Sequence, residues 1–234
     1  MINKNQAIFL LLIFIAISCF SCKEIFNGGR ISEGSIVYEI TYLDDEKDNP
    51  LIALLPKTMT TKFKDDNTIS TIEGFFGTFR LIYLSKYKEG INYSILRILD
   101  KKYMYQFDTA QPPAGYDMSM DKLKITVTDQ KIQIAGFNCN IATALCPAIS
   151  NEPLTIYYTD DINIEKPNSN NPFKQIDGVL MGFQVKLAGV NMKFIASEVI
   201  KEEIDDSEFI VPDGYNLVTK IELEDILKSF QSQE

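Results

Sequence analysis

Apolar and polar residues alternate along most of this 234-residue chain, and this alternation limits the folds that are open to it. The first clear case lies in residues 35–42, where every second residue is apolar: Ile36, Tyr38, Ile40 and Tyr42. A period of two places these side chains on one face of a half-buried β-strand. The sequence therefore predicts a protein built mainly of β-strands.

The other strands are expected where shorter alternating runs are bounded by turn residues. They lie at residues 59–63, 68–73, 78–84, 91–98, 102–107, 122–127, 131–135, 137–145, 154–159, 179–187 and 192–199. A turn is expected at 128–130, and the Asn-rich, acidic residues 160–172 are expected to form a loop. Gly178 and Gly182 indicate a bulge or a close approach of two backbones. We therefore expect one β-rich domain over residues 34–234.

The chain ends in a different pattern. Four apolar residues follow the i, i+3, i+4, i+7 spacing of one helical stripe: Leu223, Ile226, Leu227 and Phe230. Thr219, with Glu222 three residues later, forms a capping box. We expect an antiparallel curved sheet or incomplete β-barrel with one or two helices, one of them this C-terminal helix.

The first two dozen residues have the order of a secretory signal. Lys4 precedes an apolar run of about 11 residues, 7–17, and two serines and two cysteines follow it. A bilayer-spanning helix needs ~20 apolar residues, so a permanent transmembrane anchor is not expected. A cysteine at the exit of such a run is typical of bacterial lipoprotein signals, in which it is lipidated and begins the mature chain. We expect residues 1–22 to be this signal and 23–33 to be a tether.

Two cysteines fit the lipidated position. The lipobox motif of lipoprotein signals has small residues just before its cysteine. Here the large residues Ile17 and Phe20 take such places before Cys19 and Cys22, respectively. The Ser-Cys-Lys order at Cys22 resembles lipoproteins of the Bacteroidetes, so we assign lipidation to Cys22 and keep Cys19 as the alternative. A plain secretion signal and an uncleaved N-terminal anchor are the other interpretations. Stable anchoring takes two acyl chains or more, which the diacylglycerol of such lipoproteins supplies.

Charge and composition exclude several classes of function. A net charge of −9 and a pI of about 4.7 leave no basic stripe for phosphates, so nucleic-acid binding is not expected. The chain has no histidine, which excludes Ser-His-Asp and Cys-His hydrolases and His-ligated zinc sites. The acidic clusters 44–48 and 202–206 lack EF-hand alternation, so we interpret them as solvated loops. We expect no cofactor and no metal site. We also expect no enzyme activity, although Tyr, Lys and carboxylates can do acid–base work without histidine.

Two further cysteines, Cys139 and Cys146, lie within the predicted domain. Disulfides persist in exported proteins, which favours a bridge between them. If they share one continuous strand, however, their Cα atoms lie ~23 Å apart at ~3.3 Å per residue, and a disulfide needs less than ~7 Å. We therefore favour buried free thiols and keep the disulfide as the alternative. With no histidine to activate it, neither is expected to be a catalytic thiol.

Several short motifs follow one another in an order shared with exported proteins of the Bacteroidetes. They are Gly34-x-Ile36-x-Tyr38-x-Ile40, Leu55-Pro56-Lys57-x-Met59 leading into Phe63-Lys64, Ile134-Ala135-Gly136-Phe137-x-Cys139, Tyr157-Tyr158-Thr159-Asp160, Ile176-Asp177-Gly178-Val179-Leu180 and Phe209-x-Val211-Pro212-x-Gly214-Tyr215. Together they span most of residues 34–220. On these motifs the chain resembles the GLPGLI-type and related lipoproteins whose domains are of unknown function.

Such proteins are similar in layout to the LolA and LolB lipoprotein carriers. In these, an incompletely closed antiparallel barrel is covered by helices on its concave face, which binds acyl chains. The resemblance implies an apolar cavity lined by the strands with recurring large apolar residues: Phe79, Leu81, Tyr83, Met181, Phe183 and Val185. The alternative is that these side chains only fill the core, as any one-sided sheet requires.

We therefore expect a non-enzymatic lipoprotein of the cell envelope that binds a lipid or acyl chain in a half-barrel cavity. The alternative is a structural or assembly component that contacts an envelope protein through exposed sheet edges. The N-terminal lipid makes the membrane a partner in either case. We expect the outer membrane, on either its periplasmic or its surface face.

Overall fold

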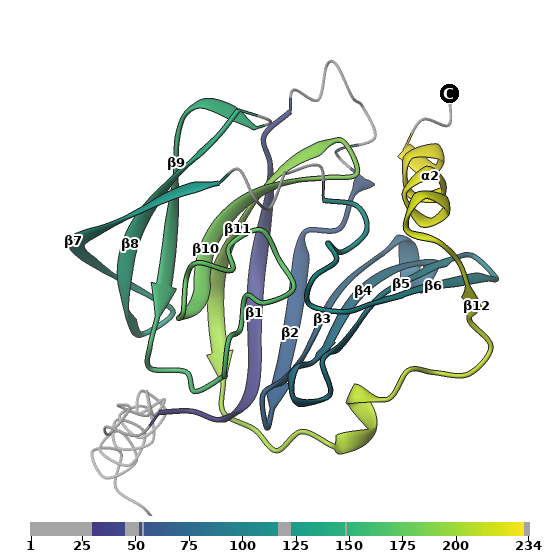
Figure 1. Ribbon diagram of the computed structural model, residues 1–234, viewed down its shortest axis with the longest axis horizontal. Coiled ribbons are helices and arrows are strands. Elements are labelled where there is room, and N and C mark those ends of the chain that lie inside the picture. Colours follow the sequence, from purple (N-terminus) through teal and green to yellow (C-terminus); the bar gives the residue numbers. More distant parts are fainter. Residues whose placement is uncertain (1–29, 45–51, 53, 117–122, 148, 232–234) are drawn as a thin grey trace, which may run out of the picture.

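A computed structural model describes residues 30–44, 52, 54–116, 123–147 and 149–231. Twelve strands in this part of the chain form a single open sheet (Figure 1). They are β1 (Glu33–Tyr42), β2 (Thr58–Lys64), β3 (Asn67–Gly74), β4 (Phe79–Lys86), β5 (Ile91–Ile98), β6 (Lys101–Phe107), β7 (Lys124–Ile134), β8 (Phe137–Cys146), β9 (Ser150–Thr159), β10 (Val179–Leu187), β11 (Val190–Ile200) and β12 (Asn216–Leu217). The helical elements there are the 3₁₀ turns η2 (Phe75–Gly77), η3 (Tyr87–Glu89) and η4 (Asp206–Phe209) and the helix α2 (Lys220–Gln231).

The strand order results from two meanders that meet at β1 and β11. Each strand from β1 to β6 pairs antiparallel with the next, and so does each strand from β7 to β11. β1 then pairs antiparallel with β11, and the short β12 runs parallel to β6. The sheet order is therefore β12-β6-β5-β4-β3-β2-β1-β11-β10-β9-β8-β7, with β12 and β7 at opposite edges. This confirms the predicted mainly antiparallel sheet that does not close into a barrel.

Three hairpins are closed by two-residue loops whose backbone has positive φ at both positions. These loops are residues 65–66, with φ of 50° and 70°, residues 135–136, with 49° and 85°, and residues 188–189, with 51° and 96°. Two positive φ values define a type I′ turn, whose twist matches that of the flanking strands. These loops fix the register of their hairpins, so that, for example, Lys64 pairs with Asn67 and Leu187 pairs with Val190.

The predicted turn at residues 128–130 is wrong, because β7 continues through these residues. Val127 pairs with Ala142 and Lys131 with Asn140, so three residues of β7 lie opposite Ile141 alone. The hydroxyl of Thr128 donates a 2.9 Å hydrogen bond to the Ile141 carbonyl and keeps the bulged segment on β8. The residues that suggested a turn therefore form a bulge of three residues opposite one, within a single strand.

The face of the sheet that bears Ile36, Tyr38 and Leu81 carries the main core, and we call it the inner face. Three parts of the chain cover it: residues 108–116, residues 160–178 and α2 (Figure 1). We call the first two the crossing segments. The opposite, outer face is covered by residues 201–211, where Ile204 and Phe209 contact Leu84. The chain then passes to the far edge of the sheet, forms β12, and returns to the inner face as α2.

The acidic residues 202–206, interpreted from the sequence as a solvated loop, attach this C-terminal part to the sheet. Glu202 accepts a 2.6 Å hydrogen bond from the Ser35 hydroxyl. Asp206 forms a 2.8 Å ion pair with Lys64, and Asp205 caps η4 by accepting from the Ser207 amide. These carboxylates have neighbouring partners from the protein and are structural.

The C-terminal helix is confirmed, together with its capping box. The Thr219 amide donates to the Glu222 carboxylate at 2.7 Å, and the Glu222 amide donates to the Thr219 hydroxyl at 3.3 Å. Leu223 and Leu227 are buried, and Ile226 is partly buried against the core. Leu223, Ile226 and Leu227 of the predicted apolar stripe therefore belong to the face that α2 turns toward the sheet.

Candidate functional site

An apolar cavity of about 90 Å³ lies between the inner face and the crossing segments. Ile36, Tyr38 and Phe183 line it from the sheet, and Ile164 and Phe173 line it from residues 160–178. We call this space the main cavity. Its walls come from parts of the chain that are far apart in sequence, so it exists only once the sheet is assembled.

Aromatic rings connect the floor of the main cavity to its cover. Phe183 stacks on Phe194, with ring centroids 4.9 Å apart. It also meets Tyr38 at 5.9 Å and Phe173 at 5.8 Å, both edge to face. Such pairs contribute ~0.5–1.5 kcal/mol each beyond the burial of their surface. Phe173 therefore anchors residues 160–178 to the sheet.

A second cavity of about 40 Å³ lies beside the first. Phe79 and Leu81 line it from β4, and Leu227 lines it from α2. Ile72 and Leu187 line both cavities. The two spaces are therefore neighbouring parts of one apolar layer between the sheet and its cover.

The structure places the six residues predicted to line a cavity in three different surroundings: the main cavity, the smaller cavity and the core. Tyr83, Phe183 and Val185 line the main cavity. Phe79 and Leu81 line the smaller one. Met181 is fully buried and lines neither. Five of the six thus reach the same apolar layer, while Met181 only contributes to the core.

Met181 lies in an irregular part of β10 that the alternation could not show. Leu180 pairs with Tyr158 and Gly182 with Tyr157, so Met181 is the extra residue of a bulge. The bulge changes the phase of the strand, and Leu180 takes a place on the main cavity. A Cβ on Gly182 would lie 2.5 Å from Cδ2 of Tyr157, which confirms the close approach predicted at this glycine.

The polar rim of the main cavity lies on β2 and β3. Thr61, Thr68 and Ser70 line it and are half-buried. The hydroxyls of Thr61 and Ser70 lie 2.8 Å apart and hydrogen-bond to each other. The rim of the main cavity therefore has small hydroxyl side chains, whereas its floor has large aromatic rings.

The buried tyrosine hydroxyls beside the cavity are structural donors. Tyr38 donates to the Leu180 carbonyl and Tyr83 to the Ala114 carbonyl, both at 2.8 Å. Burial raises the pKa of Tyr38, Tyr83 and Tyr116 above the ordinary tyrosine value. These phenols stay protonated at neutral pH and cannot serve as bases there.

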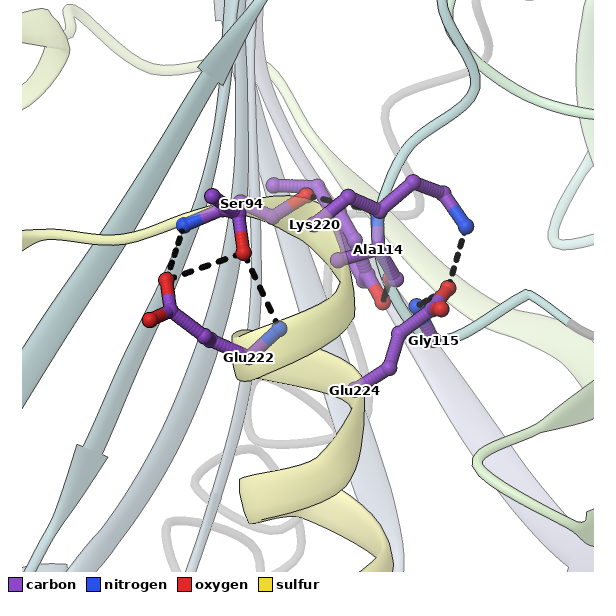
Figure 2. Close-up of polar contacts among 8 residues, drawn as sticks. Ser94, Ala114, Gly115, Lys220, Glu222 and Glu224 are labelled. Carbon is purple, nitrogen blue, oxygen red and sulfur yellow. Dashed lines mark hydrogen bonds and ion pairs between the residues drawn. The ribbon is translucent and has the colours of Figure 1, made fainter.

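The crossing segment 108–116 is fixed to the sheet and to α2 by polar contacts (Figure 2). The Ala114 amide donates to the Ser94 hydroxyl at 3.2 Å, and the Gly115 amide donates to Glu224 of α2 at 3.1 Å. Glu224 is also paired with Lys220 one turn earlier. This segment carries Tyr116 to the main cavity.

Residues 160–172 of the second crossing segment were expected only as a polar loop, and the part of this segment in the cavity was missed. Asn168 is buried and donates to the carbonyls of Ile176 and Gly178 at 2.7 and 2.9 Å. Its own side-chain oxygen accepts from Asn171 at 3.2 Å. The signal that could have shown it is the set of isolated apolar residues in and just after the polar run: Ile162, Ile164, Phe173 and Ile176.

Cys139 and Cys146 are free and buried at opposite ends of the continuous strand β8. This confirms the prediction of free thiols, and the bridge considered as the alternative is not formed. Burial raises the pKa of the Cys139 thiol to about 11, so it is protonated at neutral pH. A thiol in this state is a poor nucleophile.

Within the described ranges, no group of three or more Cys, Asp or Glu side chains is placed to hold a metal ion. A search of the same residues finds no helix both long enough and apolar enough to cross a membrane. The signal peptide at 1–22, the lipidation site at Cys22 or Cys19, and most of the tether lie outside the described residues. The lipoprotein interpretation therefore stays a prediction.

No protein-family model and no curated protein matches this sequence. Two solved structures of PNGF-II, in the C2 and P21 space groups, are similar in fold, with TM-scores of 0.53 and 0.54 at 14% and 12% identity. The match covers 83% and 84% of this chain but 32% and 33% of theirs, so this chain spans about a third of their length. At such low identity the likeness shows the fold alone.

A weaker likeness links the chain to MucB, a protein with a LolA-like fold, at a TM-score of 0.31 and 11% identity. It covers 79% of this chain and 58% of MucB. A score this low carries no argument about fold or function. The resemblance to GLPGLI-type lipoproteins and to LolA and LolB therefore stays a prediction from the sequence.

Proposed function

We propose that this protein is a non-enzymatic lipoprotein of the bacterial cell envelope that takes up an acyl chain or similar apolar ligand on the inner face of its sheet. The main cavity is the observation that carries the proposal, because it joins an apolar floor to a cover made of separate segments. The N-terminal lipoprotein signal supports the location. We place the protein at the outer membrane on the same basis.

The size of the main cavity defines how a ligand would bind. About 90 Å³ is roughly three times the ~30 Å³ that one water occupies in the liquid, whereas ligand pockets usually measure ~300–1,000 Å³. An acyl chain therefore needs the crossing segments to move outward. Residues 160–178 are held to the rest of the protein by the buried ring of Phe173 and by polar contacts such as the hydrogen bond from the Glu165 amide to Asp66.

The expected affinity follows from the burial of methylene groups. Each buried CH₂ contributes ~0.8 kcal/mol. Burying about eight of them between the sheet and its cover contributes about 6 kcal/mol, which corresponds to a Kd of roughly tens of micromolar. The cost of moving the cover reduces this value, so longer chains should bind more tightly than short ones.

The chemistry of the site supports binding over catalysis. The chain has no histidine, and the tyrosine phenols and the Cys139 thiol near the core are held protonated by burial. The buried polar side chain in the cover, Asn168, is committed to hydrogen bonds within its own segment. These groups shape the cavity, and none of them is poised to attack a ligand.

The test is binding of the neutral fluorescent dye phenylnaphthylamine to the purified full chain. Cys19→Ser and Cys22→Ser are included so that neither cysteine can carry a covalent lipid. We expect saturable binding that is competed by hexadecanol. Ser70→Phe, which fills the rim of the main cavity, should weaken binding at least about tenfold.

The matched control is Thr71→Phe, the same enlargement on the next residue of β3, which faces the outer side of the sheet. It should bind the dye like the parent protein. Absence of saturable binding, or equal losses in the two variants, contradicts the proposal. Circular dichroism verifies that both variants fold.

One observation favours the alternative function, assembly through the sheet edge. β7 is an 11-residue edge strand, and Val127 and Ile132 on it are 59% and 42% exposed. The bulge at residues 128–130 and the exposed Lys124 and Lys131 count against it, because bulges and lysines are common protections of an edge. If β7 binds a partner, Val127→Lys with Ile132→Lys should abolish recovery of one defined envelope protein after cross-linking. Unchanged recovery excludes this edge.

A further inference from the structure

A second, polar cleft opens beside the main cavity and has a volume of about 310 Å³. Tyr87, Thr109 and Ser169 contribute hydroxyl groups to it, and Lys166 and Lys174 contribute ammonium groups. Thr109 and both lysines are exposed, so the cleft reaches solvent. We call this space the lysine cleft.

The lysine cleft and the main cavity share a wall. Asn168 lines both spaces. In the same crossing segment, Ile176 lines the lysine cleft and Phe173 lines the main cavity. The cleft is polar and open where the cavity is apolar and covered. Outward movement of this crossing segment, which an acyl chain needs to enter the main cavity, would join the two spaces, and a molecule with a charged head and an apolar tail could then place one end in each.

The charged side chains that line the cleft are cationic, although the protein as a whole is acidic. The whole chain has a net charge of −9, yet both charged residues that line the cleft are lysines. Asp177 pairs with Lys166 at 2.7 Å, and it and, more weakly, Glu165 raise the pKa of Lys166. Lys166 therefore stays positively charged at neutral pH. An incoming anion would take the place of Asp177 as its ion-pair partner.

We infer that the ligand is an anionic amphiphile, whose carboxylate or phosphate head binds in the lysine cleft while its acyl chain enters the main cavity. This inference rests on the proposed function and adds the class of head group. Ammonium groups with neighbouring hydroxyls suit an oxyanion, since both kinds of group donate hydrogen bonds to it.

The test compares two competitors of equal chain length, hexadecanoate and hexadecanol, for displacement of phenylnaphthylamine from the purified full chain at pH 8. We expect hexadecanoate to bind about tenfold more tightly, a preference that shrinks at high salt because exposed charges are screened. Lys166→Gln with Lys174→Gln should remove the preference and leave hexadecanol binding unchanged. Asp177→Asn should strengthen hexadecanoate binding severalfold, because it frees Lys166.

The control for net charge is Lys131→Gln with Lys201→Gln, which removes two charges from exposed lysines that line neither the cleft nor either cavity and should keep the preference. Hexadecyl phosphate tests the second head group and should compete like hexadecanoate. Equal competition by hexadecanoate and hexadecanol, or equal effects of the two lysine pairs, overturns the inference and leaves the proposed function standing. Absence of dye binding overturns both.

Discussion

Asn168 is the residue that holds the cover of the main cavity in shape. It is buried, and its side chain bridges two carbonyls and one amide of residues 160–178. A buried carbonyl that loses its donor costs ~1–3 kcal/mol. The conformation of this whole crossing segment therefore depends on one side chain.

Asn168→Leu should lower the free energy of unfolding by about 2–3 kcal/mol, because two carbonyls lose their donor at once. Urea denaturation followed by circular dichroism measures this loss. Asn163→Leu is the control, since Asn163 is exposed in the same segment, and it should change stability by less than about 0.5 kcal/mol. Equal effects of the two changes would show that the bridging contacts contribute nothing.

Burial of Cys139 makes the stability of the protein sensitive to alkaline pH. Its pKa is raised to about 11 in the folded chain, against about 8.5 for an exposed thiol. Between these values the unfolded chain has lost a proton that the folded chain retains. Stability contributed by this group is therefore complete below about pH 8.5 and is lost as the pH rises toward 11.

Cys139→Ala should flatten the decline of stability between pH 9 and pH 10.5. The difference in slope from the parent protein is expected to reach about 1.4 kcal/mol per pH unit. Tyrosines with raised pKa values begin to lower the stability of both proteins near pH 10, where unfolded tyrosines lose their protons, and largely cancel in the difference. Parallel pH profiles for the two proteins would mean that the thiol titrates normally.

Among the elements, α2 depends on its capping box for its first turn. Thr219 and Glu222 exchange hydrogen bonds between side chain and backbone, and the contact lowers the pKa of Glu222. Because that pKa is lowered, the contact is complete at neutral pH and is lost as the carboxylate is protonated in acid. The cap matters because α2 supplies Glu224 to the crossing segment 108–116.

Thr219→Ala should destabilise α2 by about 1 kcal/mol. Amide hydrogen exchange measured for α2 at neutral pH is the direct observation, and exchange there should become severalfold faster while β1 to β5 are unchanged. Ser229→Ala, an exposed position late in the same helix, should have no such effect. Faster exchange throughout the sheet would mean that the cap stabilises more than the helix.

The alternation of residues was sufficient to predict most strands, and two of the places where it failed are bulges. Residues 128–130 read as a turn because they are polar, but the Thr128 hydroxyl and the pairing on both sides keep them in β7. Met181 continues the alternation of β10, yet the bulge there turns Leu180 toward the cavity in its place. The bulge in β10 adds one residue and shifts the phase of the alternation, whereas the bulge in β7 adds two and leaves the phase unchanged, and in both cases the pairing with the partner strand decides where the extra residues lie.

For the whole molecule, the sequence could not show which strands meet. The pairing of β1 with β11 joins residues over a hundred positions apart, and local patterns carry no information about it. The same holds for the site, because the main cavity needs residues 160–178 to cross the inner face. Individual lining residues on β4 and β10 were predictable, while the cover and the lysine cleft were not.

The crossing segment 160–178 is tied to the β2–β3 turn by one backbone contact. The Glu165 amide donates to Asp66 at 2.8 Å, and this contact, with Lys88 nearby, holds the pKa of the Asp66 carboxyl below its usual value. The tie lies beside β3, whose Thr68 and Ser70 form the rim of the main cavity. Breaking this hydrogen bond should therefore help the cover to open.

Asp66→Gly removes this tie and keeps the positive φ of the turn. Stopped-flow mixing with phenylnaphthylamine should show association several times faster than in the parent protein. Asp65→Gly, the other position of the same turn, has an exposed side chain and should leave the rate unchanged. Identical rates for all three proteins would show that the cover opens elsewhere.

The most direct test of the account is a methyl NMR titration of the full chain with hexadecanoate, because it locates the ligand without a dye. Binding on the inner face predicts saturable shifts at the methyl groups of Ile36, Val185 and Leu187, which line the main cavity. Methyl groups of Val127 and Ile132 on the edge strand should not move. Shifts confined to the edge strand, or none at the cavity up to saturation, would contradict the account.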